Sequence, residues 1–273
     1  PAAPAAAPAP APEAAPAVKP AADAMSACES AYGSRDYAGA VEPCRKAVTE
    51  KPEDAQAHRY LGSALVQTEK IAEAEPELKK ALEIDPTVTG LNFDMGMLFV
   101  KKGRLMQSIP YFEKELAGNP QSEVILSNLA SVYVETEQFD KTISTCEQLI
   151  TLAPDNLEYY GLLADAYKKA GNAEKEAETY SRMGAQDPSG RAFYNLGNMM
   201  FNKSEMDKAA DAYRRAIQQA PDNADAHFQL GMTFVNLGKF KEAITELETF
   251  VKLSPNDKRA ADAKSTVAEL KKM

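Results

Sequence analysis

The feature that most constrains the fold is the 34-residue segment Ala224–Asp257, because its pattern recurs through most of the chain. The segment predicts two amphipathic helices, separated near Gly238 and closed by Pro255. Small residues, Gly231 and Ala243, stand where the two helices would touch. Large apolar residues recur at the spacing of one helical face: Leu230, Phe234, Leu247 and Phe250. One such hairpin cannot bury its own apolar face, so neighbouring copies are expected to cover it.

Copies of this segment follow one another from residue 21. The expected units are 21–54, 55–88, 89–122, 123–156, 157–189, 190–223 and 224–257, and a polar capping helix is expected over 258–273. The first unit is the least regular, with Cys28 in the place of the glycine. The fifth runs one residue short and carries Glu176 where a small residue is usual, so that Ala177 is a candidate to take its place.

The Leu230-Gly231 pair, Ala243 and Pro255 give this segment the pattern of the tetratricopeptide repeat family, which it resembles. The resemblance extends over about 250 of the 273 residues. It implies an all-α fold, a right-handed superhelical solenoid of about seven helix-turn-helix units with a C-terminal capping helix. In that family the first helices line an inner, concave surface, and partners commonly lie along it.

The N-terminal segment differs in composition, because residues 1–20 are almost entirely alanine and proline. Proline fixes φ and removes a hydrogen-bond donor, so we expect a disordered, extended tether rather than a helix. The alternative is that the segment docks on another subunit as an extended ligand. Such spacers often follow a membrane anchor or an export signal, which is compatible with an anchor upstream of Pro1. The sequence from Pro1 to Met273 contains no apolar run long enough to span a membrane.

The cysteines bear on the cellular compartment. Cys28 and Cys44 fall on the two helices of the first expected hairpin, with their faces toward each other. They are either small core residues or a disulfide that staples the terminal unit, and we expect the disulfide. A disulfide favours an extracytoplasmic location such as a bacterial periplasm or an envelope-tethered assembly, with the cytoplasm as the alternative. Cys146 has no evident mate and is expected to be a buried free thiol.

No convergent set of catalytic, metal-binding or cofactor-binding residues stands out, so we expect a protein that is not an enzyme and needs no cofactor. His58 and His227 occupy equivalent positions in their units and are expected to pack rather than to bind metal. The net charge of −9 argues against nucleic acid as a partner.

The resemblance places partner-binding residues on the first helices of units six and seven. They combine carboxamides, which can pair with any extended backbone, with apolar residues and one arginine: Arg191, Tyr194, Asn195, Asn198, Phe201, Asn202, Phe228, Gln229, Met232 and Asn236. Some of these apolar residues could instead face the next repeat. Tyr194 stands where the chaperone-tail-binding members of the family need a lysine, so that subset is disfavoured. The expected function is a protein interaction scaffold that holds a peptide segment or partner protein. The alternative is a structural subunit of a permanent complex without a free groove.

Overall fold

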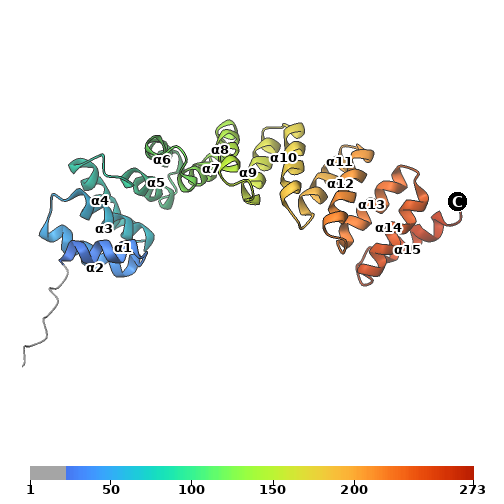
Figure 1. The fold of residues 1–273 in the computed structure, drawn as a ribbon, viewed down its shortest axis with the longest axis horizontal. Helices are drawn as coiled ribbons and strands as arrows, with labels where there is room; N and C mark the ends of the chain where they lie inside the picture. Colours follow the sequence, from blue (N-terminus) through green and yellow to red (C-terminus); the bar gives the residue numbers. More distant parts are fainter. Residues whose placement is uncertain (1–22) are drawn as a thin grey trace, which may run out of the picture. The chain divides into compact units, whose positions relative to one another are not determined.

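The computed structural model describes residues 23–273, so the expected tether over 1–20 lies outside the described residues. Within them the chain forms fifteen α-helices and no strand, and consecutive helices pair as hairpins (Figure 1). The helices are α1 (Ala24–Gly33), α2 (Tyr37–Glu50), α3 (Ala55–Gln67), α4 (Ile71–Ile84), α5 (Leu91–Lys101), α6 (Leu105–Gly118), α7 (Glu123–Glu135), α8 (Phe139–Leu152), α9 (Leu157–Lys169), α10 (Ala173–Gln186), α11 (Arg191–Asn202), α12 (Met206–Gln219), α13 (Ala224–Asn236), α14 (Phe240–Leu253) and α15 (Ala260–Leu270).

The chain divides into two compact parts between Asp94 and Met95, within α5, and each is described by itself. In the first part, α1 pairs with α2 and α3 with α4, while α2 packs on α3. In the second part, α7/α8, α9/α10, α11/α12 and α13/α14 are hairpins, and each second helix packs on the first helix of the next unit. The expectation of an all-α solenoid of helix hairpins is confirmed. The last helix, α15, packs on α14 and lies in the segment expected to cap the array.

Small residues occur where paired helices cross, because no side chain fits there. A Cβ on Gly231 would lie 2.7 Å from Cγ of Leu247, and one on Gly197 would lie 2.5 Å from the ring of Tyr213. Ala243, at the matching place on α14, is fully buried. Leu247 and Phe250 are fully buried against α15 side chains such as Val267, which covers the apolar face that a lone hairpin would expose.

The turn between the two helices of every unit contains one residue in the left-handed region. It is a glycine in three units, Gly103, Gly171 and Gly238, and another residue in four, Arg35, Glu69, Glu137 and Ser204. These seven residues occupy the same place in their units, the fifteenth position of the expected repeat. The backbone therefore needs a positive φ here whatever the side chain, and an L-residue is strained in that conformation.

The short fifth unit is accommodated at the start of α11. Five units supply an Asp, Asn or Ser directly before the first helix, whereas the sixth unit has Gly190 with φ +72° and the third has Gly90 with φ +82°. A Cβ on Gly190 would lie 2.5 Å from the carbonyl oxygen of Ala216, so glycine is required. Asp187 supplies the missing cap, because its Oδ2 accepts a hydrogen bond of 3.1 Å from the backbone N–H of Ala192.

Candidate protein-binding surface

The ten residues expected to bind a partner lie on α11 and α13, two first helices that contact each other. We call the surface formed by α9, α11 and α13 the first-helix face. Arg191, Asn195, Asn202 and Asn236 are exposed on it. The other six are half-buried: Tyr194, Asn198, Phe201, Phe228, Gln229 and Met232.

Three of the expected asparagines meet in one pocket of about 470 Å³ between α9, α10 and α11, the asparagine pocket. Its lining residues are Lys168, Glu176, Tyr180, Asn195, Asn198, Met199, Asn202 and Lys203. Arg191 and Tyr194 line a different pocket, of about 720 Å³, beside Leu157, Asn223 and Asp225 at the starts of α9 and α13. The expected residues therefore form two neighbouring sites along α11 rather than one.

Most of the carboxamides on this face have no protein partner. The side chains of Asn195, Asn202, Gln229 and Asn236 make no hydrogen bond within residues 23–273. Asn198 differs, because its Oδ1 accepts a hydrogen bond of 2.7 Å from the hydroxyl of Tyr213 on α12. Asn198 thus satisfies a buried tyrosine, and four carboxamides remain free to pair with a ligand.

Some of the apolar residues expected to contact a partner pack against the protein's own core. Phe201 packs on the core between α11 and α14, and Phe228 and Met232 pack on the core between α14 and α15. Phe228 lies 4.9 Å from Phe250, and the guanidinium of Arg259 sits 4.9 Å from the centre of the Phe228 ring. Arg259 is held there by Asp257, at 2.7 Å, and by Asp225. These contacts match the alternative that some of the expected residues face a neighbouring repeat.

Sequence reasoning missed Glu176 as a site residue. It was expected to yield the helix-crossing position to Ala177, but Glu176 itself is only 9% exposed and Ala177 is half-buried. The same position is filled in the other units by small residues with no exposed area: Ala40, Ala74, Ser108, Thr142, Ala209 and Ala243. Burial raises the pKa of the Glu176 carboxyl, against an opposing effect of Lys168 and Lys203. The departure from the repeat pattern was the available signal.

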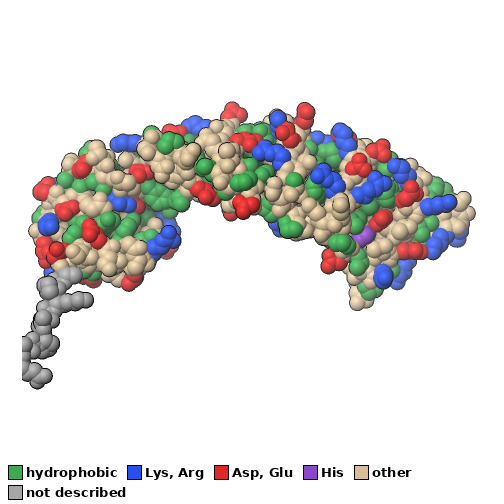
Figure 2. Space-filling model, viewed as in Figure 1, with side chains coloured by type: hydrophobic (Ala, Val, Ile, Leu, Met, Phe, Trp, Pro, Cys, Tyr) green, Lys and Arg blue, Asp and Glu red, His purple; other side chains and the backbone are tan. Residues whose placement is uncertain are grey.

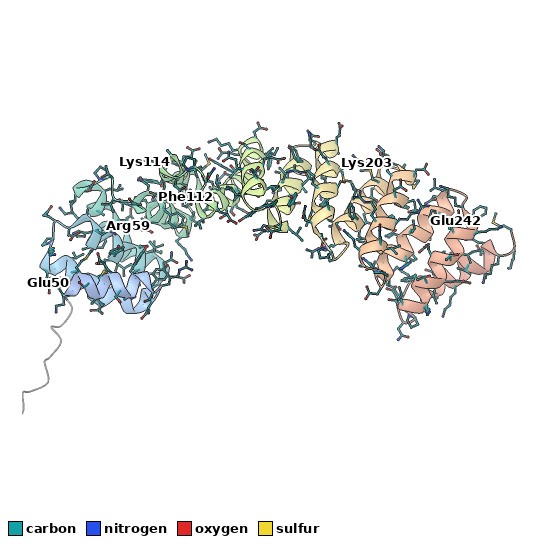
Figure 3. The ribbon with its side chains drawn as sticks, viewed as in Figure 1. Glu50, Arg59, Phe112, Lys114, Lys203 and Glu242 are labelled. Atoms are coloured by element: carbon teal, nitrogen blue, oxygen red, sulfur yellow. A yellow bond between two sulfur atoms is a disulfide. The ribbon has the colours of Figure 1, made fainter. Side chains whose placement is uncertain are left out.

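The corresponding side chains in residues 23–94 are paired with one another. The guanidinium of Arg59, a residue labelled in Figure 3, donates to Asp94 at 2.7 Å, and the hydroxyl of Ser63 donates to the same carboxylate at 2.8 Å. The hydroxyl of Tyr32 lies 2.9 Å from Ser63, and Arg59 also lies over the rings of Tyr32 and Tyr60. Because these polar groups are satisfied internally, this surface offers a ligand less than the first-helix face does.

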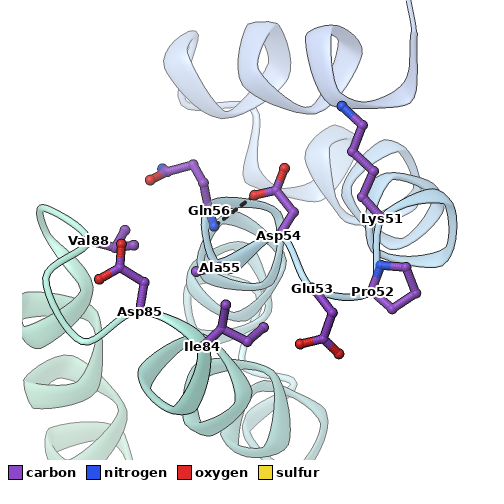
Figure 4. A pocket seen from close by; sticks show the side chains of 9 residues that line it. All are labelled: Lys51, Pro52, Glu53, Asp54, Ala55, Gln56, Ile84, Asp85 and Val88. Carbon is purple, nitrogen blue, oxygen red and sulfur yellow. Dashed lines mark hydrogen bonds between the residues drawn. The ribbon is translucent and has the colours of Figure 1, made fainter.

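A pocket of about 710 Å³ in the same part of the chain lies between the α2–α3 and α4–α5 loops (Figure 4). Two of its carboxylates already cap backbone. Asp54 accepts from the backbone N–H of Gln56 at 3.0 Å, and Asp85 accepts from the backbone N–H and the hydroxyl of Thr87. The bonds to Thr87 lower the pKa of Asp85. These residues shape turns between repeats.

His58 and His227 make the same pair of hydrogen bonds in their two units. His227 bonds Glu246 through Nδ1 at 2.6 Å and the carbonyl of Pro221 through Nε2 at 3.0 Å. His58 bonds Glu77 at 2.6 Å and the carbonyl of Pro52 at 2.9 Å. Both partners of the His227 ring are acceptors, and the imidazolium of His227 can donate to both. The hydrogen bond to Glu246 raises the pKa of His227. Each histidine thus joins the loop before its unit to the second helix of the unit.

Cys28 and Cys44 lie opposite each other in the first hairpin, fully buried, with Cα atoms 4.7 Å apart. A disulfide spans such a separation. The structure therefore brings the expected pair together, and its oxidation in the native protein stays a prediction. Cys146 is fully buried, and burial raises the pKa of its thiol to about 12, so its reactivity is low.

The face drawn in Figure 2 carries acidic and basic side chains interspersed with one another and with hydrophobic side chains. Among the described helices, none is both long and apolar enough to cross a bilayer.

Family models of the tetratricopeptide repeat match three stretches of the chain, residues 29–88, 125–158 and 196–268. Similar curated proteins include the human protein O-mannosyl-transferase TMTC1, 26% identical over 68% of this chain and 21% of its own length. Stress-induced-phosphoprotein 1 of Caenorhabditis elegans is 21% identical over 59% of this chain and 61% of its own. The peroxisomal targeting signal receptor of Saccharomyces cerevisiae is 24% identical over 72% of this chain and 34% of its own. The chain thus spans less than two thirds of each of these relatives.

Two solved structures share the fold. One is the C-terminal part of a TPR repeat-containing protein from Cytophaga hutchinsonii, with a TM-score of 0.67 and 14% identity over 86% of this chain and 97% of that one. The other is from the complex of Naa15 and Naa10 bound to HypK-THB, with a TM-score of 0.66 and 15% identity over 92% of this chain and 39% of that one. The repeat models, the helix hairpins and the glycine crossings agree, and the chain belongs to the tetratricopeptide repeat family.

Proposed function

We propose that this protein is a non-catalytic scaffold that binds an extended segment of a partner protein along the first-helix face of α9, α11 and α13. The observation that carries the proposal is the set of carboxamides without a protein partner: Asn195, Asn202, Gln229 and Asn236. In the free protein these carboxamides form hydrogen bonds with water. Against an extended chain each supplies both a hydrogen-bond donor and an acceptor. A row of them recognises a backbone with little demand on its side chains.

The name of one relative supports a binding role. This relative is named as a receptor, the peroxisomal targeting signal receptor of Saccharomyces cerevisiae. The paired network of Tyr32, Arg59, Ser63 and Asp94 in the first part of the chain suits a structural end of the array instead. We therefore propose that the site for the partner segment lies within residues 157–236.

We further propose that the protein works in an oxidising compartment, as part of a cell-envelope assembly. The support is the opposed pair Cys28 and Cys44 in the first described hairpin, which within residues 23–273 packs on a neighbouring repeat through α3 alone. A disulfide there would hold the unit that the array itself supports least.

The test is the affinity of the partner recovered by crosslinking and pulldown from the native host. Asn195→Ala with Asn202→Ala removes two exposed carboxamides that no protein group uses, so folding is preserved. Each lost hydrogen bond weakens binding by about 1 kcal/mol, and together they lower affinity about tenfold or more. The matched control is Gln186→Ala with Gln218→Ala, which removes two exposed carboxamides from second helices.

Equal affinity of both double variants and the wild type would reject the first-helix face as the binding surface. The rival, a permanent structural subunit, predicts that neither variant changes an exchangeable partner and that the isolated chain aggregates without its mates.

A further inference from the structure

The asparagine pocket contains a carboxylate that the fold itself does not use. Glu176 is 9% exposed, and its side chain makes no hydrogen bond and no ion pair with any other described residue. Its carboxylate oxygens keep some contact with solvent through the pocket, but a charge on a mostly buried side chain without a protein partner is unfavourable. The other units avoid it with Ala, Ser or Thr at the same position, for example Ala209 in the next unit. The family fold therefore does not require a carboxylate here.

The lysines around Glu176 favour its charged form but do not pair with it. Lys168 and Lys203 line the same pocket, but neither amine comes within ion-pair distance of the carboxylate. Lys203, the residue that directly follows α11 (Figure 3), directs its amine toward the carbonyl oxygen of Ala173 at 3.5 Å. Both lysines are exposed, so water screens their charges more than that of Glu176. Glu176 is thus the charged group of the pocket that most lacks a hydrogen-bond donor.

We propose that the asparagine pocket receives an arginine side chain of the bound partner segment, with its guanidinium paired to Glu176. This rests on the proposed function, since the segment that carries the arginine lies along the first-helix face. The pocket supplies what a planar guanidinium needs besides a carboxylate. Tyr180 offers an aromatic ring, and Asn195 and Asn202 offer side-chain oxygens for the remaining N–H groups. The volume of about 470 Å³ accommodates a long side chain.

Two other occupants fit less well. A lysine ammonium meets the carboxylate but presents fewer donors than the pocket has acceptors. An anion would be drawn to Lys168 and Lys203 but would have to approach the buried Glu176 carboxylate, which repels it. Charge complementarity at the buried group therefore favours arginine.

The probes are short fluorescent peptides of glycine, serine and alanine with a central arginine, citrulline or glutamate, and the readout is anisotropy with the full chain. Citrulline keeps the shape of arginine and removes its charge. We expect the arginine peptide to bind about tenfold or more tightly than the citrulline peptide, because hydrogen bonds to charged groups are the stronger ones. Glu176→Gln and Glu176→Ala should each abolish that preference. Alanine already fills this position in four other units, so the fold tolerates it.

The control Glu178→Gln makes the same charge change two residues along α10 from Glu176, outside the pocket lining, and should keep the preference. Glu178 is an exposed carboxylate that pairs with Lys175 at 2.7 Å. Lys203→Ala should strengthen binding of the arginine peptide, since it removes a like charge from the rim. Tighter binding of the glutamate peptide, weakened by Lys203→Ala, would show an anion site and overturn the proposal.

The outcome separates this inference from the proposed function. Equal binding of the arginine and citrulline peptides, both weakened by Asn195→Ala with Asn202→Ala, would leave the groove in place and overturn the arginine assignment. If no peptide binds, methylguanidinium titrated into labelled protein is the remaining probe. Chemical-shift changes around Glu176 that vanish in Glu176→Gln would support the cation pocket without a peptide groove, and their absence would overturn it.

Discussion

Two glycines in the fifth unit allow helix propensity and backbone strain to be measured separately. Gly161 lies inside α9, and Gly171 lies in the turn that follows α9, with φ +72°. A Cβ added at either position meets no atom within 4 Å. The substitutions Gly161→Ala and Gly171→Ala therefore add the same methyl group to open space and differ only in backbone conformation.

We expect opposite effects on the free energy of unfolding. Alanine is favoured over glycine in a helix by about 1 kcal/mol, so Gly161→Ala should stabilise the protein by that amount. A left-handed conformation costs an L-residue about 1–2 kcal/mol, offset by about 0.4–1 kcal/mol from the less flexible unfolded chain. Gly171→Ala should therefore destabilise by about 1 kcal/mol, and the two variants should differ by about 2 kcal/mol.

Urea unfolding followed by circular dichroism measures both variants against the wild type. Repeat arrays can unfold in steps, so amide hydrogen exchange in α9 and α10 provides a local check. A third variant, Glu137→Gly, places glycine at the equivalent left-handed position of the preceding unit. It removes the backbone strain there and should be stabilising or neutral. Equal shifts for Gly161→Ala and Gly171→Ala would refute the argument, because strain at φ +72° would then have no energetic consequence.

Three further predictions concern titration and redox state. The pKa of Glu176 is raised in the folded state, so its contribution to stability is present below about pH 4.3, the ordinary glutamate pKa, and is lost as the pH rises through the folded value. Glu176→Gln should therefore be more stable than wild type at neutral pH, and a constant difference from pH 4 to 8 would contradict this. The raised pKa of His227 in the folded state contributes stability that is fully present below about pH 6.5 and is lost as the pH rises through the folded pKa. His227→Phe should therefore remove this pH dependence. Phe193 is buried at the equivalent position of the preceding unit, which shows that the position accepts a phenyl ring. Alkylation and intact-mass measurement of the native protein should find one free thiol, Cys146, and finding all three cysteines free would reject the disulfide of Cys28 with Cys44.

The repeat pattern predicted the helix hairpins because burial of one helical face and the close crossing of two helices impose the spacing. Gly231 shows this directly, since its missing side chain is where Leu247 packs. The left-handed turn residue was visible as a shared position of Gly103, Gly171 and Gly238, but four units put other residues there and hid the rule. Local pattern thus identifies the elements better than it identifies strained positions within them.

The binding surface was harder to predict because second helices and the C-terminal helix contribute to it. Asn198 bonds Tyr213 of α12, and Phe228 is covered by Arg259 from the segment that begins α15. Neither contact follows from the face of one helix. Glu176 was visible as a departure from the pattern, but that it is a buried charge in a pocket depends on three helices meeting around it.

The central claim is that a partner segment lies along α9, α11 and α13. A photo-crosslinking amino acid at Asn195 or Gln229, in protein expressed in its own host, tests the claim directly. The account predicts that both positions crosslink to the same partner, within one short stretch of its sequence as read by mass spectrometry, and that the same group at Gln218 on α12 does not. Crosslinks from Gln218 with none from Asn195 and Gln229 would contradict the account.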